Sequence, residues 1–251
     1  MKYKKVAFIP ARSGSKRIRD KNIRHLNGHP LIAYTISSAI NSNIFDSVIC
    51  ATDSEKYADI ALHYGAEVPF LREKNISGDN SPDIEWVLYM LKTLKDFGRE
   101  YDVFSILRPT SPFRSSDEIR NAWRLFEHES NCDSLRAVEK CKNHPGKMWT
   151  ISKNRMLPLF SKHINGIPWH SSQYASLPEV FSQNASLEIA WTNTVFKKNS
   201  IAGDHICPFH STELNGFDIN SEEDWLLAEL YITHFQAKLP SVLKKPYNTK
   251  N

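Results

Sequence analysis

Hydrophobic residues near the N-terminus follow two different spacings. Residues 6–9 (VAFI) form a continuous apolar run, which is typical of a strand that is covered on both faces. Residues 30–40 (PLIAYTISSAI) place apolar side chains at helical spacing behind a proline suited to a first helical turn. This part of the chain therefore predicts a strand, a polar loop and a helix, in that order.

The same alternation continues up to residue 129. Strands are expected at residues 46–53 and 102–107, and helices at residues 54–65, 82–97 and 115–129. Later in the chain, residues 186–197 have a strand-like composition and residues 221–235 form a capped amphipathic pattern. Repeated strand and helix units predict an α/β fold with a doubly wound, mostly parallel, Rossmann-like sheet.

The regular alternation stops after Ala137. Residues 140–185 contain several prolines and isolated aromatic side chains without a clear period. We expect this segment to be an inserted arm or lid within a single domain of residues 1–240. Residues 241–251 are polar and are expected to form a flexible tail.

Composition limits the possible classes of protein. The 251 residues are 41% hydrophobic, enough for a full core, and carry a modest net charge of +4. No stretch approaches the ~18 apolar residues of a membrane span, and the first apolar run is too short for a secretory signal. Basic residues do not form a stripe interleaved with aromatics, so nucleic acid is not an expected partner. We expect a soluble, cytoplasmic protein that binds neither nucleic acid nor membrane.

The four cysteines lie far apart without a C-x-x-C pair. In a chain of this size that spacing predicts reduced thiols. The segment HICPFH, with His205, Cys207 and His210, has no second cluster to complete a zinc site, so we expect ordinary loop and core there.

The loop after the first strand carries the strongest chemical signal. Residues 9–22 read IPARSGSKRIRDKN, with small residues around Gly14 and several basic side chains. Small residues let backbone N–H groups approach a phosphate, and the basic side chains can neutralise it. A dinucleotide fingerprint and a Walker loop both need glycine spacings that this loop lacks. A polyphosphate site of another kind is predicted, and a solvated basic turn is the alternative.

Several motifs together resemble one enzyme family. IPARSGSKRIRDKN is followed in order by LNGHPLIAYTI, ATD, VPFLR, LRPTSPFR, LPEVFSQN and FDINSEEDW. This ordered set is similar to the acylneuraminate cytidylyltransferases, which make CMP-sialic acid and related CMP-nonulosonates. The resemblance implies CTP and an acidic sugar as substrates, Mg²⁺ as cofactor and a homodimer in which the inserted segment is a dimerisation arm.

The resemblance also implies roles for particular residues. Lys21, Arg12 and Lys16 are implied as catalytic, with Ser15 joining them on the triphosphate. Asn22 and Arg72 are implied at the cytosine base, although a surface salt bridge is the alternative for Arg72. The implied acceptor-binding residues are Arg108, Lys147 and Asn184. Arg108 departs from the glutamine that the family commonly has, which leaves the sugar open.

A cation that offsets phosphate charge needs oxygen ligands, and Asp218 and Asn220 lie two positions apart on one face of a strand end. They are the expected Mg²⁺ ligands, although the family usually has aspartate at both positions. A helix-capping role is the alternative for Asp218. The expected function is a cytidylyltransferase that joins CTP and a nonulosonic acid. The alternatives are a related enzyme with another acceptor or nucleotide, and a nucleotide-binding homologue with impaired catalysis.

Overall fold

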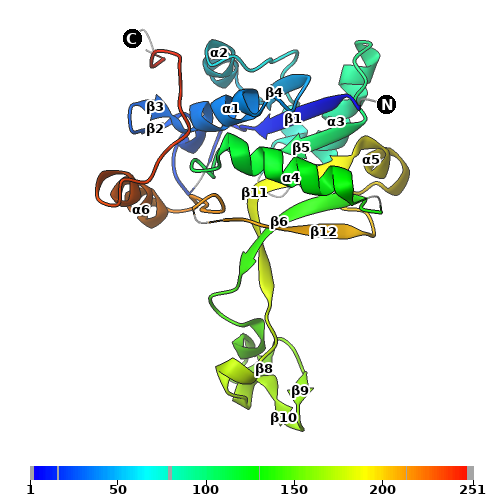
Figure 1. The fold of residues 1–251 in the computed structure, drawn as a ribbon, viewed down its shortest axis with the longest axis vertical. Helices are drawn as coiled ribbons and strands as arrows, with labels where there is room; N and C mark the ends of the chain where they lie inside the picture. Colours follow the sequence, from blue (N-terminus) through cyan, green and yellow to red (C-terminus); the bar gives the residue numbers. More distant parts are fainter. Residues whose placement is uncertain (1–2, 16, 79–80, 130, 213, 248–251) are drawn as a thin grey trace. The chain divides into compact units, whose positions relative to one another are not determined.

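The computed structural model describes residues 3–15, 17–78, 81–129, 131–212 and 214–247. Within them, a six-stranded sheet has the order β12-β6-β11-β5-β1-β4 (Figure 1). Its strands are β1 (Lys5–Pro10), β4 (Ser47–Ala51), β5 (Val103–Ile106), β6 (Ser134–Lys140), β11 (Phe181–Trp191) and β12 (Ile206–His210). β1 is parallel to both β4 and β5, whereas β11 is antiparallel to β5. The α/β class is confirmed, with a mixed, mostly parallel sheet.

Helices cover both faces of the sheet. They are α1 (Leu31–Ser42), α2 (Glu55–His63), α3 (Asp83–Asp96), α4 (Ser116–His128), α5 (Thr192–Lys198) and α6 (Glu222–Thr233). Successive side chains of β1 alternate between the faces. Ala7 and Ile9 join a buried cluster with residues of α1, α2 and α4, whereas Val6 and Phe8 join a second cluster with residues of α3 and α5.

Three strands of the sheet and one helix differ from the sequence prediction. The strand expected at residues 186–197 ends at Trp191, which pairs with Val103 at the start of β5, so the partner strand offers no further pairing. The Thr192 hydroxyl then donates to the Tyr101 carbonyl at 2.9 Å and α5 begins. β6 and β12 were not predicted, and β12 lies in the segment expected to be loop.

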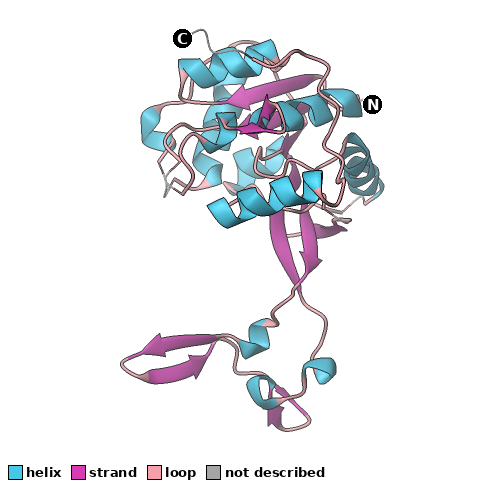
Figure 2. Cartoon of the chain, turned by 90° about the vertical axis from the view of Figure 1, so that its left-hand side faces the viewer, coloured by secondary structure: helices cyan, strands magenta, loops and turns pink. Residues whose placement is uncertain are grey.

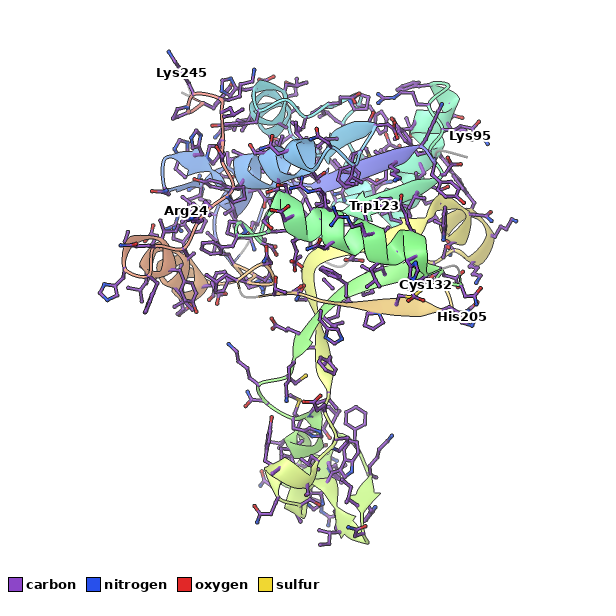
Figure 3. The ribbon with its side chains drawn as sticks, in the orientation of Figure 1. Arg24, Lys95, Trp123, Cys132, His205 and Lys245 are labelled. Atoms are coloured by element: carbon purple, nitrogen blue, oxygen red, sulfur yellow. A yellow bond between two sulfur atoms is a disulfide. The ribbon has the colours of Figure 1, made fainter. Side chains whose placement is uncertain are left out.

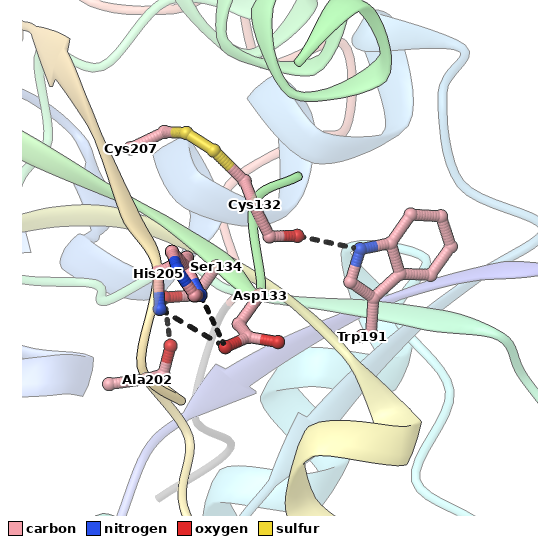
Figure 4. The surroundings of a disulfide bond; sticks show 7 residues. All are labelled: Cys132, Asp133, Ser134, Trp191, Ala202, His205 and Cys207. Atoms are coloured by element: carbon pink, nitrogen blue, oxygen red, sulfur yellow. Dashed lines mark hydrogen bonds and ion pairs between the residues drawn. A yellow bond between two sulfur atoms is a disulfide. The ribbon is translucent and has the colours of Figure 1, made fainter. Parts of the chain in front are cut away.

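Cys132 and Cys207 are joined by a disulfide, with their Cα atoms 5.9 Å apart (Figure 4). The prediction of four reduced thiols is wrong for this pair, because β6 and β12 are neighbours in the sheet and bring together cysteines that are 75 positions apart. Figure 3 shows Cys132 beside His205, near the start of β12. Cys50 and Cys141 are free.

Residues Val138–Gln183 form a compact unit of their own, with bounds close to those of the insertion predicted at residues 140–185. The unit contains two hairpins, which Figure 2 shows as separate pairs of strands. They are β7 (Trp149–Ser152) with β8 (Arg155–Pro158), and β9 (His163–Ile164) with β10 (Ile167–Pro168). In the turn of the first hairpin Lys153 and Asn154 have φ of 46° and 62°, as a two-residue type I′ turn requires.

Shorter elements complete the chain. They are strands β2 (His25–Leu26) and β3 (His29–Pro30), and 3-10 helices η1 (Lys21–Ile23), η2 (Lys74–Ile76), η3 (Pro145–Lys147), η4 (Trp169–Ser171) and η5 (Tyr174–Ser176). Part of the expected tail makes specific contacts. The Tyr247 N–H donates to the Tyr64 hydroxyl at 3.0 Å, and Val242 packs on the core. Within the described parts of the chain, no helix is long and apolar enough to cross a bilayer.

Candidate functional site

A cavity of about 580 Å³ opens where β1 and β5 end. Pro10 ends β1, and Arg108, Pro109 and Thr110 follow β5. In an open α/β sheet this carboxyl edge is where ligands bind. The cavity brings together most of the predicted site residues, namely Arg12, Ser15, Lys21, Asn22, Arg72, Arg108, Asp218 and Asn220. Lys16 lies outside the described residues.

The basic loop is fastened to the end of β4 by a carboxylate that sequence analysis did not select. Asp53 accepts hydrogen bonds from the Ser13 N–H at 2.7 Å and from the Ser13 hydroxyl at 2.8 Å. Gly14 follows with φ of 75°, a left-handed conformation that glycine adopts without steric cost. The Tyr57 hydroxyl donates to Asp20 at 3.1 Å and fixes the far end of the loop to α2.

Lys21 is buried at the base of the cavity, with 7% of its surface exposed. Its ammonium donates to the Ile219 carbonyl at 2.6 Å. Burial lowers the pKa of Lys21, and the Asp218 carboxylate opposes that shift. The ammonium thus joins the basic loop to the segment between β12 and α6 that carries Asp218. The strand end expected at Asp218 and Asn220 is wrong, because β12 already ends at His210. Asn22 beside it is also buried and donates to the Arg12 carbonyl at 3.4 Å.

Arg72 is buried rather than part of a surface salt bridge. Its exposed fraction is 5%, and the guanidinium lies over the Trp86 ring at 5.1 Å from the centroid. One nitrogen, Nη2, donates to the Ile76 carbonyl at 2.7 Å, whereas Nε has no hydrogen-bond partner among the described residues. Burial lowers the pKa of Arg72 to about 10. A rigid cation with a free donor is suited to recognising the edge of a base.

Asp218 contributes a carboxylate to the lining of the cavity. Its Oδ2 accepts from the Asn220 amide at 2.5 Å, and its Oδ1 is buried without a hydrogen-bond partner among the described residues. The capping alternative for Asp218 does not hold, because Ser221 and Asp224 form the capping box of α6. A buried carboxylate oxygen without a partner is costly unless a ligand satisfies it.

A fully buried arginine, Arg114, lies near Asp218. Arg114 donates to the Arg108 carbonyl at 3.2 Å, to the Thr35 hydroxyl at 2.9 Å and to the Ser186 carbonyl. Burial lowers the pKa of Arg114 to about 9, and Asp218 is the nearby charge that opposes the shift. Arg114 was not predicted from the sequence, because most of its partners come from segments far apart in the chain.

Arg108 lines the cavity and takes part in a network of ion pairs. Its Nη2 donates to Asp83 at 2.6 Å and to Glu188 at 2.8 Å. Glu188 also pairs with Arg136. Although burial acts in the opposite direction, Arg108 lowers the pKa of Asp83, which therefore stays ionised. Neither carboxylate nor Arg136 was predicted from the sequence.

The other two residues predicted to bind the acceptor are engaged elsewhere. The Asn184 side chain accepts from the Ser186 hydroxyl at 2.7 Å and donates to the Ser211 hydroxyl at 3.1 Å, and its neighbour Ala185 lines the cavity instead. Within the unit 138–183, the Lys147 ammonium donates to the carbonyls of His170 and Ser172. Asn184 is therefore not among the residues that line the cavity.

A sheet with a basic loop and a buried carboxylate at its carboxyl edge defines a nucleotide-binding α/β protein, and comparison with known proteins narrows the class. Residues 6–143 match the family model described as cytidylyltransferase. The CMP-N,N'-diacetyllegionaminic acid synthase of Legionella pneumophila is 31% identical over 89% of this chain and 94% of its own length. The chain belongs to the cytidylyltransferase family.

Further relatives agree with this assignment, and a solved structure shares the fold. The N-acylneuraminate cytidylyltransferase of Escherichia coli is 43% identical over 51% of this chain, which covers 29% of that protein. The pseudaminic acid cytidylyltransferase of Campylobacter jejuni is 41% identical over 49% of this chain and 53% of its own length. The fold matches a CMP:2-keto-3-deoxy-manno-octonic acid synthetase complexed with CTP, with a TM-score of 0.67 over 92% of this chain and 99% of that one, at 12% identity.

Proposed function

We propose that this protein is a CMP-nonulosonate synthetase, which joins CTP to a nonulosonic acid and releases pyrophosphate. Its family and the names of its relatives support this activity. The observation that carries the proposal is one cavity that combines the buried cations Lys21 and Arg72 with the unpartnered Oδ1 of Asp218. Such a cavity suits a charged nucleotide.

The reaction is an in-line displacement. The anomeric hydroxyl oxygen of the acceptor forms a bond to the α-phosphorus of CTP, the bond to the pyrophosphate oxygen breaks, and the hydroxyl proton is released. The protein contributes position and charge. Arg12, Ser15 and Lys21 hold the phosphates, with Lys16 predicted beside them, and Asn22 and Arg72 hold the base.

Asp218 and Asn220 are the proposed Mg²⁺ ligands, through the unpartnered carboxylate oxygen and the amide oxygen. The described residues contain no group of three or more His, Cys, Asp and Glu suited to a metal ion. Phosphate oxygens would have to complete the coordination, which is the usual arrangement for Mg²⁺ bound with a nucleotide. When bound, Mg²⁺ supplies positive charge that offsets the charge of the departing pyrophosphate.

The proposed assembly is a homodimer formed through residues 138–183. This unit exposes large apolar side chains, including Ile151 at 74%, Leu157 at 57% and Met156 at 56%. Exposed apolar surface on one small unit is typical of an interface. Lys147 and Asn184 stay predicted acceptor ligands. Light scattering of the wild type and an Ile151→Asp, Leu157→Asp variant tests the dimer, and a monomeric wild type would contradict it.

The activity is tested by measuring pyrophosphate release from CTP and Mg²⁺ with N-acetylneuraminic, legionaminic, pseudaminic and 3-deoxy-manno-octulosonic acids. GTP and UTP replace CTP in parallel. We expect release with CTP and at least one nonulosonic acid, and its loss in Lys21→Met. Lys95→Met is the matched control, because Lys95 is exposed on α3 and pairs with Glu100.

Three outcomes would contradict the proposal. Release with the octulosonic acid alone, or with another nucleotide, would favour the related sugar nucleotidyltransferase. Tight binding of CTP without turnover would favour the impaired homologue, and restoration by Asn220→Asp would locate the defect.

A further inference from the structure

Four charged residues form a continuous chain of ion pairs that runs from the cavity into the sheet. Asp83 pairs with Arg108, Arg108 with Glu188, and Glu188 with Arg136. Side-chain exposure is 33% at Asp83 and 24% at Arg108, but only 4% at Glu188 and 10% at Arg136. The two acids and two bases balance. The cavity end of the chain is therefore accessible and the sheet end is fixed.

The fixed end rests on paired strands. Glu188 lies on β11 opposite Ile106 of β5, and Arg108 follows Ile106 by two positions. Arg136 lies on β6, which neighbours β11. Groups placed on rigid strands hold their geometry better than groups on loops. Breaking a buried ion pair is costly, so Glu188 is expected to keep its contacts when a ligand binds.

The guanidinium of Arg108 keeps hydrogen-bond donors that no described residue uses. Both hydrogen bonds from Arg108 to described residues leave from Nη2, one to Asp83 and one to Glu188. The two N–H groups of Nη2 belong to different edges of the guanidinium, and each edge has a second donor on Nη1 or Nε. Asp83 therefore occupies half of an edge that a free carboxylate could bind with both oxygens.

We propose that the acidic acceptor displaces Asp83 from Arg108, while Glu188 and Arg136 keep Arg108 in position. One carboxylate replaces another, so the charge of the network is conserved, and a bidentate contact replaces a single hydrogen bond. Glu188 is a positioning residue and Asp83 is the competitor that the acceptor must replace. This inference rests on the proposed function and adds to it the group that reads the acceptor's carboxylate.

Two variants test the displacement by moving the KM for the acceptor in opposite directions. Asp83→Asn removes the competing charge and should lower this KM by about 3- to 10-fold, because hydrogen bonds to charged groups are about twice as strong as neutral ones. Glu188→Gln should raise it by about 10-fold or more, since Arg108 loses its charged anchor. Simple charge repulsion predicts a fall for both, because each variant removes one negative charge beside the same guanidinium.

A double-mutant cycle separates the proposal from an indirect effect. In an Arg108→Gln background Asp83→Asn should leave the KM for the acceptor unchanged. A fall of the same size there, or no fall in the wild-type background, would overturn the inference. Direct CTP binding by calorimetry checks folding. If Glu188→Gln does not fold, Asp83→Asn and the cycle still decide.

Different results would contradict the proposed function and the displacement of Asp83. Absence of pyrophosphate release by the wild type with every acidic sugar removes the proposed function and this inference together. Turnover by the wild type with an unchanged KM in Asp83→Asn removes this inference alone.

Discussion

Asp53→Ala tests whether the basic loop must be held in shape before CTP binds. Asp53 accepts two hydrogen bonds from Ser13, at 2.7 and 2.8 Å. A hydrogen bond to a charged group contributes about 1.5–3 kcal/mol. Losing one at the lower limit costs about 1.5 kcal/mol and losing both about 3 kcal/mol, which correspond to about 10- and 100-fold in affinity. We expect the Kd for CTP to rise by about 10- to 100-fold because the nucleotide must then order the loop.

Isothermal titration of CTP measures this change, and Asp46→Ala is the matched control. Asp46 also accepts a backbone N–H, from Lys5 at 2.7 Å, but lies just before β4 and not at the cavity. Asp53→Asn distinguishes loop order from charge, because it removes the charge and keeps an acceptor for Ser13. An unchanged Kd in Asp53→Ala, or tighter binding in both Asp53 variants, would refute the role of the loop.

Three further predictions follow from the site and the sheet. The pKa of Lys21 lies below its usual 10.5, so kcat/KM for CTP should fall as the pH rises through that lowered pKa, and Lys21→Arg should remove the fall. Between that lowered pKa and 10.5, Lys21 stays protonated in the unfolded chain but loses its proton in the folded protein. The contribution of Lys21 to the free energy of unfolding should therefore rise with pH in this range. Asn220→Asp should lower the Mg²⁺ concentration for half-maximal activity by about 10-fold, because a carboxylate binds Mg²⁺ better than an amide; no decrease would argue against a ligand role. Reduction of Cys132–Cys207 should lower the free energy of unfolding by up to about 4.5 kcal/mol in the chain-entropy treatment, and Cys132→Ser should make denaturation insensitive to reductant.

Local signals in the sequence identified the elements around the site. The buried strand, the basic loop and the proline-led helix lie within 40 residues, so their order and roles can be predicted without knowledge of distant contacts. β6 and β12 were missed because their pairing depends on neighbours far along the chain. α5 was missed because Thr192 and Val195 are β-branched residues that favour strands, and the end of β5 overrides that preference.

The site residues that sequence analysis missed share one property: each acts through a distant partner. Asp53 bonds a residue 40 positions away, and Glu188 bonds Arg108 80 positions away. Arg114 reads in the sequence as the end of a proline-rich turn, and only the packing shows its burial. A charged residue in an apolar strand, such as Glu188 in SLEIAW, is the one signal that could have indicated a buried ion pair.

The contact between the Lys21 ammonium and the Ile219 carbonyl links residues 198 positions apart. The family model matches residues 6–143, yet Asp218 and Asn220 lie far beyond that range. A shortened chain that kept only the residues matched by the family model would therefore lose both proposed Mg²⁺ ligands from the cavity. For homologues known only from partial genes, a match to the family model does not show that the proposed metal-binding residues are present.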